Sequence, residues 1–550
     1  MIRSRVRRAV TFMRARALIG WGLVAATVAS CKDVDAGLGL EGGASADTGA
    51  IASSEGSTTR VDESDDGVVD SSSDGGGETK LDVGAPATTG DEPPPIAPTC
   101  ATIGDFPPTS LGCVFWSADL PPDTTMGTYA YPYGIAVGNP SASEAANIRI
   151  EDMRGDGGTL REVTSFVLMP GESRMTSVNG SGGVLDGQNQ SLVDGVNELS
   201  AFRIVADVPV TATQFNLVGG APTEMPEAST LLPEHALGTS HLSLAGPENA
   251  RVAVIAVEDG TTVTTPGGDV VLDAFDAWYG ALASDVATGS WFSADQPIAV
   301  FSGNYITMIP WDRCCADSLQ EQLVPLSAWG TRYVAARHPA RLPAVNPAPE
   351  AVYWKLVAAE PNTTITLTPA IDGVDAVSLT AVGDVLELST AESFVAESEQ
   401  RFMLVQFMAS GSTITLPDPY TSLGGDPYMV QVPAIDQWLT ELPFLTDTSY
   451  GYDFVTIARE AGTTVELDCL GEVSDDHFTP IAGTPYEVAQ VFLDDPDTGG
   501  EGDCVDGQQF LRADHPVGIV VGGYDSWSSY GYPGGLGVTT LWEPPTEPPG

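Results

Sequence analysis

The chain has 550 residues, of which 23 are Lys or Arg and 74 are Asp or Glu, for a formal net charge of −51 at pH 7. A field of this sign repels phosphate backbones and argues against a nucleic acid as partner. Only three lysines are present, which argues against lysine-dependent phosphate or Schiff-base chemistry. Residues 99–550 hold 40 of the 42 aromatic residues, so we expect this part to be globular.

Residues 1–30 are typical of a signal peptide. Six arginines precede an apolar run from Ala17 to Val28, which is shorter than the roughly 20 residues that a membrane-spanning helix needs. The run ends in Val28-Ala29-Ser30-Cys31, which resembles a bacterial lipobox. That resemblance implies cleavage before Cys31 and lipid attachment to it; an ordinary signal peptide with an incidental cysteine is the alternative. We expect an exported chain held by lipid at the outer membrane, facing the cell exterior.

Residues 31–98 follow as the lipid-anchor cysteine and a linker. Positions 32–98 contain 12 Gly, 8 Ser and 15 acidic residues and no aromatic residue. Such a segment cannot bury enough apolar surface to offset the entropy of ordering it, so we expect a disordered tether.

Residues 99–545 carry three patterns that recur in a fixed order. The first is an apolar strand, a turn and a Thr-rich strand, and the second is an acid-x-Pro triplet before an apolar strand. The third is a strand end with Pro and then a Trp-Gly-like turn. The first occurs at 252–264, 354–367 and 454–467, with a looser copy at 133–150; the second at 207–209, 295–297 and 514–516, with a degenerate copy at 399–401; the third at 232–238, 324–330 and 432–438.

These spacings predict about four tandem units of about 100 residues in one compact array. Their runs are short and β-branched, alternate with period two, and end at Gly, Pro, Asp or Asn, which predicts an all-β fold. About seven short strands per unit favour β-sandwich-like repeats. A propeller-like arrangement is the alternative.

Three stretches together resemble a known family. They are Ser-Leu-Gly-Cys-Val-Phe-Trp at 110–116; Pro-Ile-Ala-Val-Phe-Ser-Gly at 297–303 with Cys-Cys-Ala-Asp-Ser-Leu-Gln-Glu-Gln-Leu-Val-Pro at 314–325 and Ala-Trp-Gly at 328–330; and Ser-Tyr-Gly-Tyr-Pro-Gly-Gly at 529–535. The set resembles the IgGFc-binding protein N-terminal domain family. The resemblance implies binding to surfaces or matrix outside the cell, and it identifies no ligand-binding residues.

Six cysteines besides Cys31 fit an oxidising compartment. Cys100 with Cys113 and Cys469 with Cys504 are expected as local disulfides. Cys314 and Cys315 are adjacent, and either a vicinal disulfide or pairing elsewhere fits the sequence. Metal ligation is a weaker interpretation, because there is no CxxC motif and the five histidines are scattered.

Two aromatic segments are candidate binding surfaces. Trp311 and Arg313 flank Asp312 just before the two adjacent cysteines, and both residue types are favoured at binding hot spots. The segment 522–535 places four aromatic residues among small ones, a composition that suits protein or glycan contact. These four are Tyr524, Trp527, Tyr530 and Tyr532. The alternatives are a disulfide-held crossover for the first segment and a terminal loop folded over a core for the second.

A calcium site is also considered at 494–503. Asp495, Asp497, Glu501 and Asp503 lie at even offsets in a Gly-containing loop, and carboxylate oxygens suit Ca²⁺. The segment is not a full EF-hand loop, and a solvated acidic hairpin is the alternative. We expect no other cofactor.

No GxSxG, HExxH or P-loop motif is present, so we do not expect an enzyme. A carboxylate pair of a surface glycan hydrolase is the remaining enzymatic alternative, because 59 acidic residues lie in 99–550. We predict a lipid-anchored cell-surface binding or adhesion protein that recognises an extracellular protein or glycan. A self-associating structural component of the envelope is the alternative.

Overall fold

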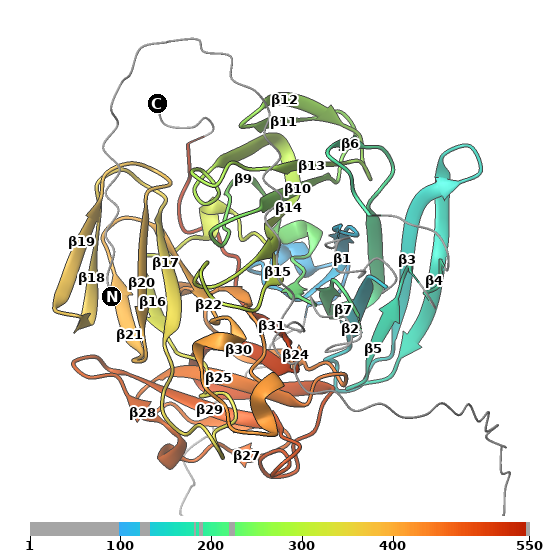
Figure 1. The fold of residues 1–550 in the computed structure, drawn as a ribbon. Coiled ribbons are helices and arrows are strands. Elements are labelled where there is room, and N and C mark those ends of the chain that lie inside the picture. The colour runs from blue at the N-terminus through green and yellow to red at the C-terminus, as the bar shows by residue number, and fades with distance from the viewer. Residues whose placement is uncertain (1–97, 122–131, 181–182, 186–190, 219–225, 546–550) are drawn as a thin grey trace, which may run out of the picture. The chain divides into compact units, whose positions relative to one another are not determined.

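The regular structure of the chain is nearly all β-strand, linked by short 3-10 turns (Figure 1). A computed structural model describes residues 98–121, 132–180, 183–185, 191–218 and 226–545. Every strand pairing in these ranges is antiparallel, which confirms the all-β, sandwich-like prediction. No helix among the described residues is long and apolar enough to cross a membrane. The predicted signal peptide, Cys31 and tether lie outside the described residues.

The strands form four successive stretches, which follow one another around the middle of Figure 1 in order of colour. The first stretch contains β1 (Gly112–Ser117), β2 (Gly134–Gly138), β3 (Ala146–Gly155), β4 (Thr159–Leu168), β5 (Ser173–Ser177), β7 (Phe202–Phe215) and β8 (Ala228–Thr230), after the 3-10 turn η2 (Ile103–Asp105). The second contains β6 (Gly195–Asn197), β9 (Gly238–Leu242), β10 (Ala250–Ala256), β11 (Thr261–Thr265), β12 (Gly268–Leu272), β13 (Ala277–Ala281), β14 (Trp291–Thr307) and β15 (Asp317–Gln322), with η6 (Glu234–Ala236) before β9.

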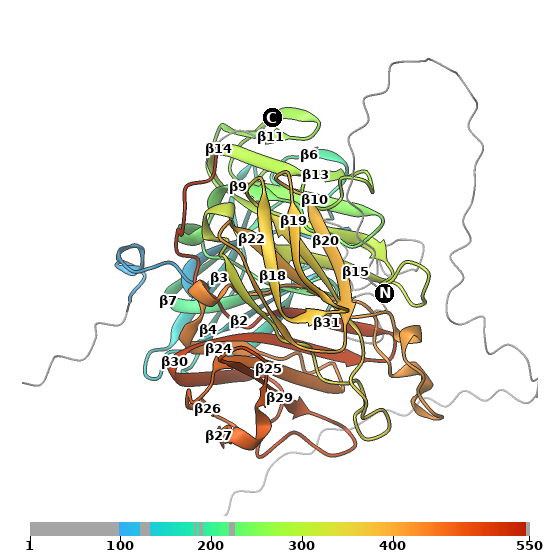
Figure 2. The same ribbon diagram turned by 90° about the vertical axis from the view of Figure 1, so that its left-hand side faces the viewer.

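The third and fourth stretches complete the unit, and Figure 2 shows the third in yellow, facing the viewer. The third contains η7 (Leu326–Ala328), β16 (Arg332–Ala335), β17 (Val352–Ala358), β18 (Thr363–Ile371), β19 (Val374–Leu379), β20 (Val385–Thr390), β21 (Phe394–Glu397), β22 (Phe402–Phe407), η8 (Gly411–Thr413), η9 (Tyr420–Ser422) and β23 (Met429–Gln431). The fourth contains η10 (Ile435–Gln437), β24 (Leu439–Leu445), β25 (Tyr452–Glu460), β26 (Val465–Leu467), β27 (Gly471–Glu472), η11 (Asp475–His477), β28 (Thr479–Pro480), β29 (Tyr486–Asp494), β30 (Gln508–Asp525) and β31 (Ser528–Pro533).

All four stretches share one pairing scheme, in which the two halves of a long strand, or two successive strands in its place, pair with different partners. In the first stretch this strand is β7, whose first half pairs with β1 and β3 and whose second half pairs with β2 and β8. β14 pairs in the same way with β9, β11, β10 and β15, and β30 pairs with β24, β26, β25 and β31. In the third stretch the strand is divided into β21 and β22, which lie in separate four-stranded sheets. The number of repeats stays a prediction from the sequence, and this shared scheme is consistent with it.

The acid-x-Pro triplets mark the place where the long strand passes from one set of partners to the other. Pro209, Pro297 and Pro516 lie inside β7, β14 and β30. A proline suits this position because it cannot donate to a ladder that changes partner there. In the third stretch, the degenerate copy at 399–401 falls between β21 and β22.

The acidic residue of each triplet holds the neighbouring Thr-rich strand or its counterpart in place. The Asp207 carboxylate accepts a hydrogen bond from the backbone N–H of Asn147 at 2.7 Å. Asp295 and Asp514 accept the corresponding bonds from Thr262 and Thr464, each at 2.8 Å. The first two sequence patterns therefore recur together because one supplies the acceptor and the other the donor of the same contact.

Replacing Asp295 with alanine is expected to lower the free energy of unfolding by about 1 kcal/mol, because the Thr262 N–H loses its acceptor. Asp295→Asn keeps an acceptor oxygen and should cost less than half as much. Urea titrations of both variants measure this. Equal losses in the two variants would show that the charge of Asp295, and not this hydrogen bond, matters.

The last strands of the four stretches contact one another in a closed ring. β8 contacts β15, β15 contacts β23, β23 contacts β31, and β31 contacts β8. Side chains link several of these contacts: the Gln322 N–H donates to Ser229 Oγ at 2.6 Å, and Thr230 Oγ donates to the Pro533 carbonyl at 2.7 Å. This closed ring is also a feature of the propeller-like alternative.

The two ends of the described unit are joined beside this ring. The Ser110 N–H donates to the Leu536 carbonyl at 2.9 Å, and the Val538 N–H donates to the Pro108 carbonyl at 2.7 Å. Thr109 and Gly537 form an antiparallel bridge between these bonds. The segment after β31 therefore closes the unit against the segment before β1.

Candidate functional site

Three loops from different stretches meet at one end of the unit. They connect the long strand to the last strand of their stretch: residues 308–316, 408–428 and 526–527. The Ser412 N–H donates to the Cys314 carbonyl at 2.7 Å, and the Ile309 N–H donates to Ser410 Oγ at 3.0 Å. The Trp527 N–H donates to the Ser422 carbonyl at 3.2 Å. These bonds join the three loops into one surface.

The 308–316 loop presents the first predicted binding segment to solvent. Trp311 is 46% exposed, which is unusual for so large an apolar side chain, and Asp312 and Arg313 beside it are exposed. Cys314 and Cys315 form a disulfide with each other, and Cys315 is buried. A held loop therefore carries an exposed aromatic ring and an exposed guanidinium side by side.

The second predicted binding segment is mostly core. Tyr524, Tyr530 and Tyr532 are buried, so the prediction that they line a binding surface is wrong. Tyr530 donates from its hydroxyl to Asp453, Tyr532 donates to the Leu445 carbonyl, and the Tyr524 ring stacks on Tyr452 with centroids 4.8 Å apart. The six residues of β31 are buried throughout, because this strand belongs to the central ring. Of the four aromatic residues, only Trp527, in the turn before β31, remains partly exposed.

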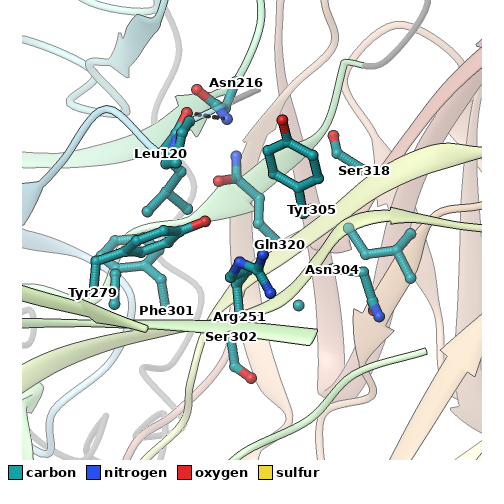
Figure 3. Close-up of a pocket in the computed structure, with 14 residues that line it drawn as sticks. Leu120, Asn216, Arg251, Tyr279, Phe301, Ser302, Asn304, Tyr305, Ser318 and Gln320 are labelled. Atoms are coloured by element: carbon teal, nitrogen blue, oxygen red, sulfur yellow. Dashed lines mark hydrogen bonds between the residues drawn. The ribbon is translucent and has the colours of Figure 1, made fainter. Parts of the chain in front are cut away.

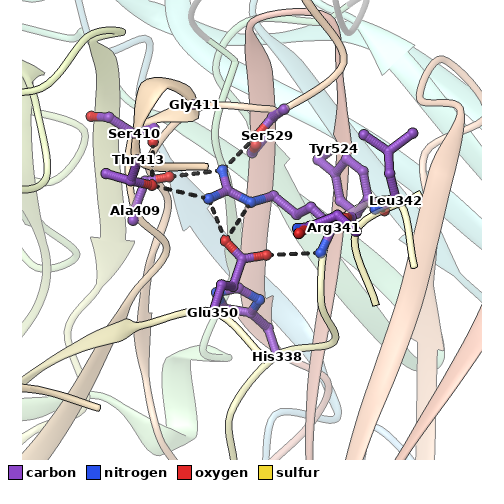
Figure 4. A network of polar contacts seen from close by, with 12 residues as sticks. His338, Arg341, Leu342, Glu350, Ala409, Ser410, Gly411, Thr413, Tyr524 and Ser529 are labelled. Atoms are coloured by element: carbon purple, nitrogen blue, oxygen red, sulfur yellow. Dashed lines mark hydrogen bonds and ion pairs between the residues drawn. The ribbon is translucent and has the colours of Figure 1, made fainter. Parts of the chain in front are cut away.

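The long 408–428 loop was not identified from the sequence, and a buried arginine holds it in place (Figure 4). Arg341 is fully buried, and its guanidinium donates to the carbonyls of Ala409 at 2.8 Å and Gly424 at 2.5 Å. It also bonds the Glu350 carboxylate twice, through Nε at 2.9 Å and Nη2 at 2.5 Å. One side chain thus ties both ends of the loop to the 341–350 segment.

The same ion pair sets the protonation of Glu350. Burial by itself raises the pKa of this carboxyl, but the charge and hydrogen bonds of Arg341 outweigh burial and bring the pKa below its usual value. Glu350 therefore stays ionised beside Arg341.

Partly exposed apolar side chains surround this network. Val345, Ile414, Tyr420 and Leu423 pack against a buried cluster that includes Leu342 and Tyr524. We use the name loop surface for these side chains together with the exposed or partly exposed residues of the neighbouring loops: Trp311, Arg313, Val345, Ile414, Tyr420, Leu423 and Trp527. A sequence signal existed in Pro417, Pro419 and the Gly424-Gly425 pair, which mark a loop but not what it contacts.

The remaining two cysteine pairs form as expected. Cys100 bonds Cys113 at the start of β1, and Cys469 bonds Cys504 within the fourth stretch. With Cys314–Cys315 there are three disulfides, and none of the six described cysteines is free.

The structure does not gather the four carboxylates considered for calcium. The buried Asp495 side chain accepts hydrogen bonds from the Asp497 and Thr498 backbone, which closes a local turn. Glu501 accepts from the Phe492 N–H at 3.2 Å and contacts His477 Nε2 at 3.0 Å. Within the described ranges, no group of three or more His, Cys, Asp or Glu side chains could hold a metal ion. These hydrogen bonds account for the positions of Asp495 and Glu501 in the 494–503 loop. Among the described residues, no hydrogen bond links the Asp503 side chain to the other three carboxylates.

The comparison with family models identifies the chain's relatives. The model described as IgGFc binding protein matches residues 227–523, more than half of the chain, from just before the ring strand β8 to near the end of β30. Searches of curated proteins and of solved structures find no significant match. The match contains the 308–316 and 408–428 loops and the Arg341 network. The chain belongs to the IgGFc binding protein family.

Proposed function

We propose that the protein is an exported, lipid-anchored binding protein of the cell surface that recognises an extracellular protein through the loop surface. The family suggests extracellular protein binding, and three disulfides fit an oxidising compartment. The anchor at Cys31 and the tether to residue 98 rest on the sequence pattern. Together they would hold the binding unit away from the membrane.

One observation carries the choice of surface, namely the exposed Trp311 beside Arg313 on a loop that is hydrogen-bonded to the 408–428 loop. Tryptophan and arginine supply a large share of binding energy at protein interfaces. A loop that is already fixed loses little conformational entropy when it binds. The neighbouring apolar side chains Ile414, Tyr420 and Leu423 extend the contact area.

The negative charge of residues 99–550 restricts the kind of partner that we expect. Residues 99–550 contain 14 basic and 59 acidic residues, so they repel acidic proteins and attract basic ones. Binding should weaken as salt rises, because exposed charges are screened. We propose a binding role without catalysis, and the self-associating envelope component stays as the competing hypothesis.

Trp311→Ala is expected to weaken binding at least about tenfold, the loss typical of a hot-spot aromatic residue. The assay titrates the oxidised protein, lacking residues 1–31, onto intact cells and secreted matrix. Val271→Ala removes a side chain that is 65% exposed in β12, and it should leave binding unchanged. Binding that does not saturate, or that Trp311→Ala leaves intact, would reject the loop surface as the site.

The competing hypothesis makes a different prediction for the protein alone. A structural component should assemble as its concentration rises, in the absence of cells or matrix. Analytical ultracentrifugation over a wide concentration range distinguishes the two. A single monomeric species together with saturable binding supports the proposal, whereas assembly without binding supports the alternative.

A further inference from the structure

A pocket between the first and second stretches contains a buried polar atom without a partner (Figure 3). This atom is Asn216 Oδ1, which accepts no hydrogen bond from any described residue. The free space of about 30 Å³ suits one or two water molecules. The Arg251 guanidinium in the same pocket already bonds the Tyr279 hydroxyl. This pocket is therefore filled by water and its own side chains, and we assign no ligand to it.

Unpaired polar groups of another kind lie in the fourth stretch, where four aspartates come together: Asp447, Asp453, Asp494 and Asp506. Asp453 in β25 and Asp494 in β29 are opposed in the antiparallel pair, where like charges destabilise a sheet. Thr446 and Gly507 bond each other twice at 3.0 Å, through the Thr446 N–H and through Thr446 Oγ1. This double bond holds together the two segments that carry the other two aspartates.

The centre of the cluster is the carboxyl pair of Asp453 and Asp506. Asp453 is fully buried; its Oδ1 accepts from the Tyr530 hydroxyl, but its Oδ2 has no partner among the described residues. The Asp506 carboxyl lies within hydrogen-bonding reach of Asp453, and its Oδ1 has no described partner either. Two carboxyl groups this close cannot both carry a bare charge, so a proton or a cation must lie between them.

The surrounding charge favours a divalent cation over a single proton. Asp447 and Asp494 repel both members of the pair. Within the described residues, none of the four aspartates forms an ion pair with Arg, Lys or His. One shared proton would leave most of this charge unbalanced, whereas a divalent cation offsets two charges at once.

The oxygens at the pair suit Ca²⁺, which takes carboxylate, hydroxyl, carbonyl and water ligands at about 2.3–2.6 Å. That distance is shorter than the roughly 2.8 Å contact with a water molecule, so an oxygen closed to water can still bind the ion. Two carboxylates are fewer than a group of three, which the described residues do not provide, so neutral oxygens must complete the site. The Thr446 hydroxyl bonds the Asp506 carboxyl, and Asp506 is partly exposed, which leaves a side open for water ligands.

We propose that Asp453 and Asp506 bind one Ca²⁺ ion, with the Thr446 hydroxyl and water completing its coordination. The charges of Asp447 and Asp494 lie beside the ion and strengthen its binding. An affinity of about 10⁻⁴ to 10⁻³ M is typical of extracellular calcium modules. The site uses none of the four carboxylates considered from the sequence and no residue of the loop surface, so it can fail or hold independently of the function proposed above.

Calorimetric titration of the oxidised protein lacking residues 1–31 with CaCl₂ tests the proposal. The protein is first treated with a chelator, and about 0.15 M NaCl screens its diffuse negative charge. We expect one saturable Ca²⁺ site and at least tenfold weaker binding of Mg²⁺, which gives up its water ligands reluctantly. Asp453→Asn and Asp506→Asn should each weaken calcium binding at least tenfold. Asp503→Asn makes the same change at an exposed carboxyl group of the neighbouring loop and should leave binding unchanged.

Thermal unfolding keeps the test decisive if Asp453→Asn fails to fold. Calcium in excess should raise the unfolding midpoint of the parent and of Asp503→Asn but not that of the partly exposed Asp506→Asn. The absence of saturable calcium binding would overturn the proposal and would mean that the pair shares a proton. Binding that Asp506→Asn leaves unchanged, or that Asp503→Asn weakens equally, would overturn the site, and equal affinity for Mg²⁺ would overturn the choice of ion. Trp311→Ala should not alter calcium binding, which separates this result from the loop surface.

Discussion

Replacing Arg341 with alanine is expected to lower the free energy of unfolding by about 3–5 kcal/mol, the cost of leaving one partner of a buried ion pair alone. Glu350, whose side chain is 6% exposed, would keep a charge with no counter-ion. The carbonyls of Ala409 and Gly424 would lose their donor at the same time. Guanidinium titration measures the loss of stability. Hydrogen exchange should show faster exchange of backbone amides in the 408–428 loop.

Two controls separate the buried pair from charge in general. Arg332 forms a pair with Asp436 at 3.4 Å in which both side chains are more than a third exposed, so Arg332→Ala should cost at most about 1 kcal/mol. The double variant Arg341→Met with Glu350→Leu removes both charges and should recover much of the stability. A single Arg341→Ala variant as stable as Arg332→Ala would contradict the role assigned to Arg341.

Arg341 also links stability to the proposed function. The Arg341→Ala variant retains Trp311 and Arg313, but the neighbouring 408–428 loop has lost its hydrogen bonds to Arg341. We therefore expect Arg341→Ala to weaken cell binding under conditions where the protein remains folded. Unchanged binding would show that Trp311 acts independently of the 408–428 loop.

The all-β fold class could be predicted because it depends on patterns among residues that are close in sequence. Period-two runs and the acid-x-Pro triplets recur every hundred residues or so, and the structure explains the triplets through Asp207, Asp295 and Asp514. The disulfides Cys100–Cys113 and Cys469–Cys504 were likewise predictable from nearness in sequence. Arg341 was not predictable, because its carbonyl partners lie 68 and 83 residues away.

The tyrosines of β31 show where local reasoning fails. Alternation in Tyr530-Gly531-Tyr532 predicts a strand but does not say what covers its two faces. The ring places β23 on one side and β8 on another, so both faces of β31 are buried. Gly531 is needed there, because a Cβ at this position would lie 2.7 Å from the Tyr428 ring. Aromatic residues among glycines thus served packing rather than recognition.

The burial of acidic residues is a second feature that local patterns do not reveal. Charge counts do not distinguish exposed carboxyl groups from buried ones, yet several carboxyl groups are buried near the ring. Asp317 and Glu321 lie in β15, Glu227 precedes β8, and Asp426 precedes β23. Nothing in the segment Asp317–Gln322 distinguishes it from a strand with exposed acids until its neighbours are known.

These carboxyl groups are expected to make the protein more stable at pH 5 than at pH 8. Burial raises the pKa of Asp119 to about 6 and raises the pKa values of Asp317 and Glu321 well above their usual range. Burial and then repulsion from Asp317 and Glu321 raise the pKa of Glu227 in the same way. A tenfold difference in proton affinity between the folded and unfolded states corresponds to about 1.4 kcal/mol of stability.

The sign follows from which state holds the proton. Above pH 4 to 5 the unfolded chain loses these protons while the folded protein keeps them, so the native state binds more protons and its stability falls as pH rises. The lowered pKa of Glu350 acts in the opposite direction, but its contribution is lost only when the pH falls through that low value. Burial lowers the pKa values of His241 and His338 to about 3 and about 4, so these two groups oppose the trend between pH 8 and pH 5. The carboxyl groups with strongly raised pKa values outnumber them, so we expect the net change to favour the folded protein at pH 5; these groups are Glu227, Asp317, Glu321, Asp426 and Asp453.

Glu321→Gln isolates one of these groups, since it keeps the shape and an oxygen that can accept from Ser229 Oγ at 3.1 Å. The variant should be more stable than the parent at pH 8, and its stability should change less between pH 8 and pH 5. Glu392→Gln makes the same change at an exposed site and should leave the pH profile unchanged. Urea titrations at pH 5, 6, 7 and 8 test this. A Glu321→Gln profile that matches Glu392→Gln would mean that Glu321 is ionised in the folded protein.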